Sequence, residues 1–223
     1  MIKQKDIFWE TIDIFAKEGI LPHVILVGSW VELIYEVAYL PDFESSFQTR
    51  DIDFLVKNIR QPREKVDAVK VLEEHDFIHD VDPITGASKF YKEGIIEVEF
   101  LVKELGAGQV EPYHIKSLGV KAEGLRNMNL LAENAITVIA KGYQITIPKP
   151  AAYVLEKLII NEHRGIKKEK DIRAVQRILD IIKQCKEETE TIIGLYNSLR
   201  PKQKRKIDEV CEESGINLFL RPS

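Results

Sequence analysis

A change of hydrophobic period between residues 24 and 56 constrains the fold of this chain most strongly. The apolar run VILV at residues 24–27 predicts a short buried strand. After Gly28-Ser29 the apolar residues recur every three or four positions up to Pro41, which predicts a helix. Residues 51–56, DIDFLV, then return to strand character. The segment therefore predicts strand, helix and strand in succession.

Further helices and strands are predicted on both sides of this segment. Apolar residues at helical spacing predict helices at 5–18 and 63–75. Short β-type runs predict strands at 77–78, 89–91 and 95–102, and a hairpin of 135–139 with 143–147. The mixture predicts an α/β or α+β sheet domain. Residues 103–135 lack a clear period and are left without an assignment.

The C-terminal third of the chain is predicted to be helical. Pro148 and Pro150 introduce an amphipathic segment at about 151–162. Helical patterns follow at 168–184, 189–198 and 202–213. We therefore predict an α/β domain over residues 1–147 and a helical domain over residues 148–223.

Composition excludes several classes of protein. The 223 residues contain no apolar run of the roughly 18 residues that a membrane span needs, and the N-terminus does not resemble a signal peptide. Only two cysteines are present, Cys185 and Cys211, which argues against a disulfide framework and against a Cys/His zinc site. A cytoplasmic location is expected.

Charge is distributed unevenly along the chain. Residues 161–206 hold 13 Lys/Arg against 7 Asp/Glu, whereas residues 1–160 hold 18 against 25. A basic segment can attract a polyanion such as RNA, but helices often carry such charges as a solvated face, and we favour that simpler interpretation.

Two pairs of carboxylates carry the strongest chemical signal. Asp51 and Asp53 are two residues apart on a predicted strand, so both side chains point to one face of the sheet. Glu97 and Glu99 repeat this spacing on a second predicted strand. If the strands are neighbours, the carboxylates form an acidic cluster that suits hard cations such as Mg²⁺. Pairs of this kind also occur as exposed charges on a strand, so the spacing alone is only moderately specific.

Gly28-Ser29 adds a possible anion site. A glycine allows phosphate oxygens to approach the backbone, and the first turn of the following helix presents N–H groups to an anion. A purely structural alternative is a capping box, in which Ser29 and Glu32 cap that helix.

These motifs together resemble the DNA polymerase β-like nucleotidyltransferase superfamily, in particular its bacterial and archaeal branches. The resemblance is carried by VILVGSWVELIYE, TRDIDFLV and IIEVEFLV, and extends to the lysine-bearing segment IPKPAAYVLEKLIINEHRGIKKEKDI. It implies a nucleotidyltransferase-like mixed-sheet core in which Asp51 and Asp53 bind metal and Glu99 is the third carboxylate, with Glu97 as the second choice. It also implies that Gly28 and Ser29 hold nucleotide phosphates, and that Lys157 contacts them. For Lys157, an exposed surface lysine is the alternative.

The resemblance further implies an enzyme that uses Mg²⁺ or Mn²⁺ to transfer a nucleoside monophosphate from an NTP, such as ATP, to an acceptor hydroxyl. The acceptor, which could be tRNA or another RNA, a protein or a small molecule, is not specified. Two alternatives remain open. A non-catalytic relative would bind a nucleotide or a partner without turnover, and a glycosyltransferase would use Asp-x-Asp to hold the metal of a nucleotide sugar.

Overall fold

The computed structural model describes residues 2–40, 42–45, 49–104, 111–163 and 165–218. The chain divides into two compact units. The α/β unit comprises residues 1–39 and 47–148, and the helical unit comprises residues 40–46 and 149–223. No helix in the described ranges is long and apolar enough to cross a membrane.

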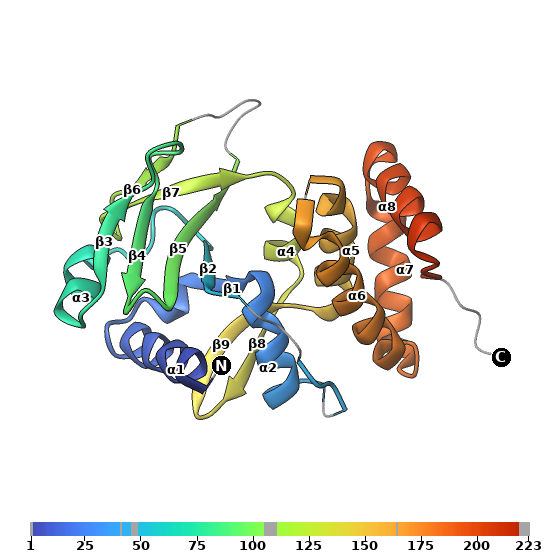
Figure 1. Cartoon of the computed structure of the whole chain (residues 1–223), viewed down its shortest axis with the longest axis horizontal. Coiled ribbons are helices and arrows are strands. Elements are labelled where there is room, and N and C mark those ends of the chain that lie inside the picture. The colour runs from blue at the N-terminus through green and yellow to red at the C-terminus, as the bar shows by residue number, and fades with distance from the viewer. Residues whose placement is uncertain (1, 41, 46–48, 105–110, 164, 219–223) are drawn as a thin grey trace. The chain divides into compact units, whose positions relative to one another are not determined.

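A mixed sheet forms the centre of the α/β unit (Figure 1). Its main path runs in the order β1-β2-β5-β4-β3, and β7 joins a second part of β5 and carries β6 on its far side. The predicted fold class is therefore confirmed. The strands are β1 (Val24–Val27), β2 (Asp51–Val56), β3 (Ile78–Val81), β4 (Ser88–Lys92), β5 (Ile96–Lys103), β6 (Tyr113–Ile115) and β7 (Val120–Leu125).

Strand β5 organises the sheet because three strands share its edges. It runs parallel to β2 on one side. On the other side, its first half pairs antiparallel with β4 and its second half pairs parallel with β7. Every residue of β5 from Ile96 to Val102 therefore lies within the sheet, and its side chains alternate between two faces.

One face of the sheet is covered by helix α1 (Ile2–Lys17). Phe15 of this helix packs against Phe54 and Phe100, with ring centroids 4.8 Å and 5.8 Å away. Phe8 stacks on Trp30 at a centroid distance of 4.5 Å. Because side chains alternate along a strand, the neighbours of Phe54 and Phe100 in sequence, including Asp53 and Glu99, belong to the opposite face.

The remaining elements of the α/β unit surround this core. Strands β8 (Ala135–Ala140) and β9 (Tyr143–Pro148) form the predicted hairpin, and β9 lies beside β1. Helix α2 (Val31–Ala38) is attached to the end of β9, because the hydroxyl of Tyr35 donates to the carbonyl oxygen of Pro148 over 2.7 Å. The other helices are α3 (Ala68–Glu74) and α4 (Met128–Glu133).

The helical unit is built around α5 (Pro150–Ile160), which packs against each of the three later helices. Its central position explains why ten of its eleven residues are buried, from Pro150 to Ile159. The other long helices are α6 (Lys168–Ile182), α7 (Lys186–Ser198) and α8 (Pro201–Ser214), and the predicted helical character of this region is confirmed.

The prediction of a helix over residues 63–75 placed its start too early. Helix α3 begins at Ala68, and the side chain of Asp67 caps it by accepting a hydrogen bond from the backbone N–H of Lys70. On either side of this cap, the N–H groups of Val66 and Ala68 donate to the carbonyl oxygens of Ser117 and Leu118, respectively. Tertiary hydrogen bonds therefore hold residues just before the helix in a non-helical path, although their apolar spacing favours a helix.

Candidate active site

Gly28 shapes the junction between β1 and α2. Its φ of +69° lies in the left-handed region that favours glycine. A Cβ at this position would collide with Oδ2 of Asp53, because Val27 and Asp53 are paired across β1 and β2. Residues Gly28–Trp30 then form a 3-10 turn that leads into α2. The predicted strand-to-helix junction is confirmed, and it lies directly against one of the candidate aspartates.

Ser29 is buried in this turn. Helix α2 begins at Val31, its N-cap is Trp30, and no side chain caps it by a hydrogen bond. The capping-box alternative for Ser29 and Glu32 is therefore wrong, because the 3-10 turn moves the start of the helix past the serine.

The four candidate carboxylates form two adjacent pairs across the sheet. In the parallel register of β2 and β5, Asp51 is opposite Glu97 and Asp53 is opposite Glu99. Paired residues on neighbouring strands lie about 5 Å apart and point to the same face. The residues between them, Ile52 and Val98, are fully buried, as expected for the face that packs on α1. The two acidic strands are therefore neighbours, which was the condition for an acidic cluster.

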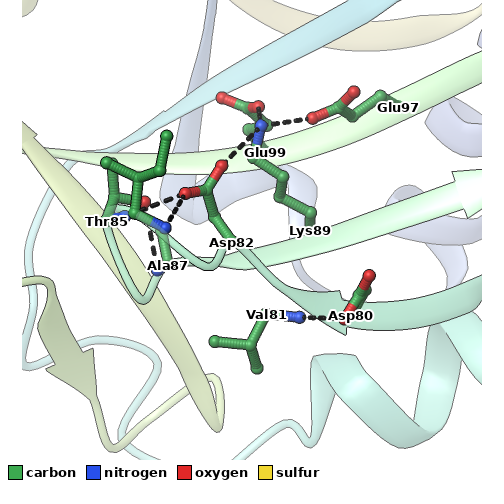
Figure 2. Close-up of polar contacts among 9 residues, drawn as sticks. Asp80, Val81, Asp82, Thr85, Ala87, Lys89, Glu97 and Glu99 are labelled. Carbon is green, nitrogen blue, oxygen red and sulfur yellow. Dashed lines mark hydrogen bonds and ion pairs between the residues drawn. The ribbon is translucent and has the colours of Figure 1, made fainter.

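Lys89 lies beside the acidic face and pairs with three carboxylates. In the pairing of β4 with β5, Lys89 is opposite Glu99, on the edge of β5 away from β2. Its Nζ lies 2.6 Å from Oε1 of Glu97, 2.7 Å from Oε1 of Glu99 and 3.3 Å from Oδ2 of Asp82 (Figure 2). The row across the three strands is therefore Asp53, Glu99 and Lys89, with a cation at one end.

Asp82 connects Lys89 to the turn between β3 and β4. Its Oδ1 accepts hydrogen bonds from the backbone N–H groups of Ile84 at 2.9 Å and Thr85 at 2.8 Å (Figure 2). The turn is closed by the backbone N–H of Gly86, which donates to the carbonyl oxygen of Asp82. One carboxylate thus orders the turn and holds the ammonium at the same time.

Burial and neighbouring charges shift the pKa of the groups on this face. Burial raises the pKa of Glu99 to about 7, and the hydrogen bond with Glu97 and the charge of Asp53 act in the same direction. For Glu97, burial opposes a decrease in pKa, but hydrogen bonds with Glu99 and Lys89 outweigh it and lower the pKa. Burial likewise opposes an increase in the pKa of Lys89, yet its bonds to both glutamates raise it. Burial and the neighbouring carboxylates therefore disfavour the charged form of Glu99.

The donor chemistry of this face fits a divalent metal. Asp51, Asp53 and Glu99 offer only carboxylate oxygens, which Mg²⁺ and Mn²⁺ prefer, and the Asp53 carboxylate lies directly against the backbone of Gly28. Their side chains are nevertheless not gathered as a ready-made site, since no three Asp, Glu, His or Cys residues in the described part of the chain are grouped to hold a metal ion. The ammonium of Lys89 is bound to Glu99 instead.

Lys157 lies in the helical unit and is 2% exposed, so the exposed-surface alternative for this residue is wrong. Its Nζ donates to Oδ1 of Asp171 over 2.8 Å and lies 5.3 Å from the ring centroid of Tyr153. Both charged side chains are buried, which makes the pair an internal feature of the helical unit.

The basic segment carries several pairs that fit a solvated face. Lys206 pairs with Glu162 at 2.9 Å, and the Nζ of Lys204 donates to the carbonyl oxygen of Asn197 over 2.8 Å.

Lys89 and Asp82 were not identified from the sequence. Lys89 lies in a predicted strand. Because side chains alternate along a strand, the apolar residue Phe90 next to it was the available signal that Lys89 belongs to the other face of the sheet. Its partners are at residues 82, 97 and 99, and only the pairing of β4 with β5 brings them together.

Comparison with known proteins gives one clear result. A family model described as "Nucleotidyltransferase" matches residues 9–192. No curated protein matches the chain significantly.

Two solved structures are more distantly similar. The crystal structure of an antigenic nucleotidyltransferase-like protein from Paracoccidioides brasiliensis is 12% identical, with a TM-score of 0.42 over 83% of this chain and 84% of that chain. A tRNA nucleotidyltransferase complexed with a primer tRNA and an incoming ATP analog is 14% identical, with a TM-score of 0.26. That match covers 89% of this chain and 59% of the other.

Proposed function

This chain belongs to a nucleotidyltransferase family, and we propose that it transfers a nucleoside monophosphate from an NTP to an acceptor hydroxyl. In this reaction the acceptor oxygen forms a bond to the α-phosphorus. The bond from that phosphorus to the oxygen that bridges to the β-phosphate breaks, pyrophosphate leaves with that oxygen, and the hydroxyl proton of the acceptor passes to water.

The observation that carries the proposal is the parallel register of β2 and β5. It sets Asp53 beside Glu99 on a sheet face away from α1, with the Gly28 backbone against Asp53. A fold that needed only a stable sheet would gain nothing from four carboxylates on adjacent strands, because like charges repel. Cations bound at this face would offset the repulsion between the four carboxylates.

In the proposed mechanism, Asp51, Asp53 and Glu99 hold the divalent ions, Mg²⁺ or Mn²⁺. When bound, such ions activate the attacking hydroxyl and stabilise the charge of the triphosphate. Glu99 orients the acceptor by accepting a hydrogen bond from its hydroxyl. Gly28 and Ser29 hold the β- and γ-phosphates at the start of α2, where the helix dipole favours an anion.

The proposal includes two further parts. The catalytic elements lie in a domain of residues 1–147, which a helical domain of residues 148–223 follows. Lys157 of the helical domain contacts phosphate only after its bond to Asp171 is released. The acceptor is a hydroxyl of tRNA or another RNA, of a protein or of a small molecule. A cytoplasmic location, where NTPs and Mg²⁺ are both present, belongs to the same proposal.

The first test is calorimetric titration of the protein with each NTP, with and without Mg²⁺, for the wild type and for Asp53→Ala. We expect metal-dependent binding that the substitution removes, since it deletes the carboxylate closest to Gly28. Circular dichroism of both proteins controls for folding. Absence of binding at millimolar NTP would contradict the proposal and favour a non-catalytic role.

The second test follows label into an acceptor. Transfer of label from α-phosphate-labelled NTP to RNA, protein or small molecules supports nucleotidyl transfer and identifies the acceptor class. Transfer of label from a nucleotide sugar instead would support the glycosyltransferase alternative.

A further inference from the structure

Lys89 is enclosed by carboxylates from two different directions. Glu97 and Glu99 approach its ammonium from β5, and Asp82 approaches from the β3–β4 turn (Figure 2). About a fifth of each of these four side chains is exposed, at 19–21%. The ammonium is therefore a fixed element of the acidic face and not a freely moving surface charge.

The anchoring of Lys89 is asymmetric. Asp82 is held by two backbone N–H groups of its own turn, so this end of the contact cannot move without disrupting the turn. Glu97 is opposite Asp51, and Glu99 is opposite Asp53, which lies against Gly28. Of the two glutamates bound to Lys89, Glu99 is thus the one paired with the aspartate that lies against Gly28.

A divalent cation bound at this face would compete with the ammonium of Lys89 for the same carboxylate, that of Glu99. Both seek the Glu99 carboxylate, and two cations sharing one carboxylate repel each other at short distance. Because Asp82 and Glu97 retain Lys89, the ammonium stays close when Glu99 turns toward another cation.

We propose that Lys89 is a positioning residue whose ammonium, anchored by Asp82 and Glu97, competes with the divalent cation for Glu99 and so weakens metal binding at this face. The lysine offsets part of the negative charge of the carboxylate row and orders it when no divalent ion is bound, and it limits the affinity of the site for the ion. This inference rests on the proposed function, because it presupposes that Asp53 and Glu99 bind the metal.

Electron paramagnetic resonance of Mn²⁺ tests the inference without an acceptor or turnover. The free Mn²⁺ signal is titrated with wild-type protein, Lys89→Met, Lys89→Arg and Asp53→Ala. We expect Lys89→Met to bind Mn²⁺ about tenfold more tightly than the wild type, since one positive charge leaves the vicinity of a divalent ion. Lys89→Arg keeps the charge and should retain wild-type affinity.

Lys92 supplies a matched control on the same strand. Its ammonium pairs with Glu10 of α1 at 2.6 Å, on the opposite side of the sheet. Lys92→Met removes an equal charge from β4 and should leave Mn²⁺ affinity unchanged within about twofold. If Lys89→Met does not fold, Lys89→Gln takes its place, because glutamine also removes the charge but can still donate to Glu97.

The outcomes separate the inference from the function beneath it. No Mn²⁺ binding by the wild type, or undiminished binding by Asp53→Ala, overturns the proposed metal site itself. Binding that Asp53→Ala abolishes but that is unchanged or weaker in the folded neutral Lys89 variant overturns the inference alone. Tighter binding in that variant, with Lys92→Met unchanged, supports it.

Discussion

At the scale of single residues, Gly28 and Gly19 provide a natural comparison. Both have positive φ values, +69° and +70°. A Cβ at Gly28 would collide with the Asp53 carboxylate, whereas a Cβ at Gly19 would meet no atom within 4 Å. A substitution of Gly19 therefore tests backbone strain alone, whereas a substitution of Gly28 also tests the close approach to Asp53.

We expect Gly19→Ala to lower the free energy of unfolding by about 1–2 kcal/mol, the cost of a left-handed alanine. Gly28→Ala should cost more than this, and it should also weaken Mg²⁺-dependent NTP binding by displacing Asp53. Denaturant unfolding and NTP titration of both variants check the prediction. Equal effects of the two substitutions on NTP binding would show that the contact with Asp53 is unimportant.

The buried pair of Lys157 and Asp171 has a different consequence. Lys157→Met leaves Asp171 buried without its 2.8 Å partner and should lower the free energy of unfolding by about 3–5 kcal/mol. The neutral double variant Lys157→Met with Asp171→Asn should recover part of that loss.

Chemical denaturation measures the stability effect, and titration of folded protein with NTP tests the proposed phosphate contact. A double variant that regains stability but still binds NTP weakly would support a phosphate role. Normal NTP binding by that variant would assign Lys157 to the structure of the helical unit alone.

The sequence predicted these residues to different extents. Asp51, Asp53, Glu97 and Glu99 could be assigned to strand faces because a period of two depends only on local spacing. The burial of Lys157 was not predicted, since its spacing also fits an exposed helix face. Its burial depends on three other helices packing around α5, which no local pattern specifies.

At the scale of elements, the β3–β4 turn is ordered by one carboxylate. The backbone N–H groups of Thr85 and Ile84, together with Lys89, hold the pKa of Asp82 at about 2, below its ordinary value of 3.8, although burial opposes this. A lowered folded-state pKa means that the stabilisation is complete above the ordinary pKa and is lost as the pH falls through about 2.

We therefore expect Asp82→Asn to be less stable than the wild type at pH 7, and the difference to shrink as the pH falls from about 4 toward 2. Thr85→Val serves as the control, because it removes a hydrogen bond of the turn, from the Ala87 N–H, without removing an ionisable group. Denaturation midpoints across this pH range provide the measurement. A constant difference between Asp82→Asn and wild type would contradict the assigned role.

Elements with strong local signals were predicted well, and the others were not. The hairpin of β8 and β9 follows from two apolar runs around Lys141-Gly142, and both of these residues have positive φ. Strands β6 and β7 were missed because β6 has only three residues, Gly119 and Gly124 interrupt the pattern around β7, and β7 is stabilised by pairing with β5. Tertiary pairing selected a strand where propensity was weak.

At the scale of the whole molecule, one short segment belongs to a different compact unit from the chain on either side of it. Residues 40–46 cluster with the helical unit, although the chain on either side of them belongs to the α/β unit. Phe43 illustrates this, since it is 2% exposed and its ring centroid lies 6.0 Å from Cζ of Arg177 on α6. An α/β sheet domain could be predicted from the sequence, but the grouping of this short segment with the helical unit could not, because its two apolar residues, Leu40 and Phe43, form no periodic pattern that specifies a partner.

The placement of residues 40–46 has a consequence for synthesis on the ribosome. This segment emerges long before residues 149–223, the rest of its unit. A nascent chain can pair β1, β2 and β5 while Phe43 still lacks its final surroundings. The helical unit is therefore completed only after α5, α6, α7 and α8 have been translated, and until α6 is made Phe43 lacks Arg177 as a neighbour.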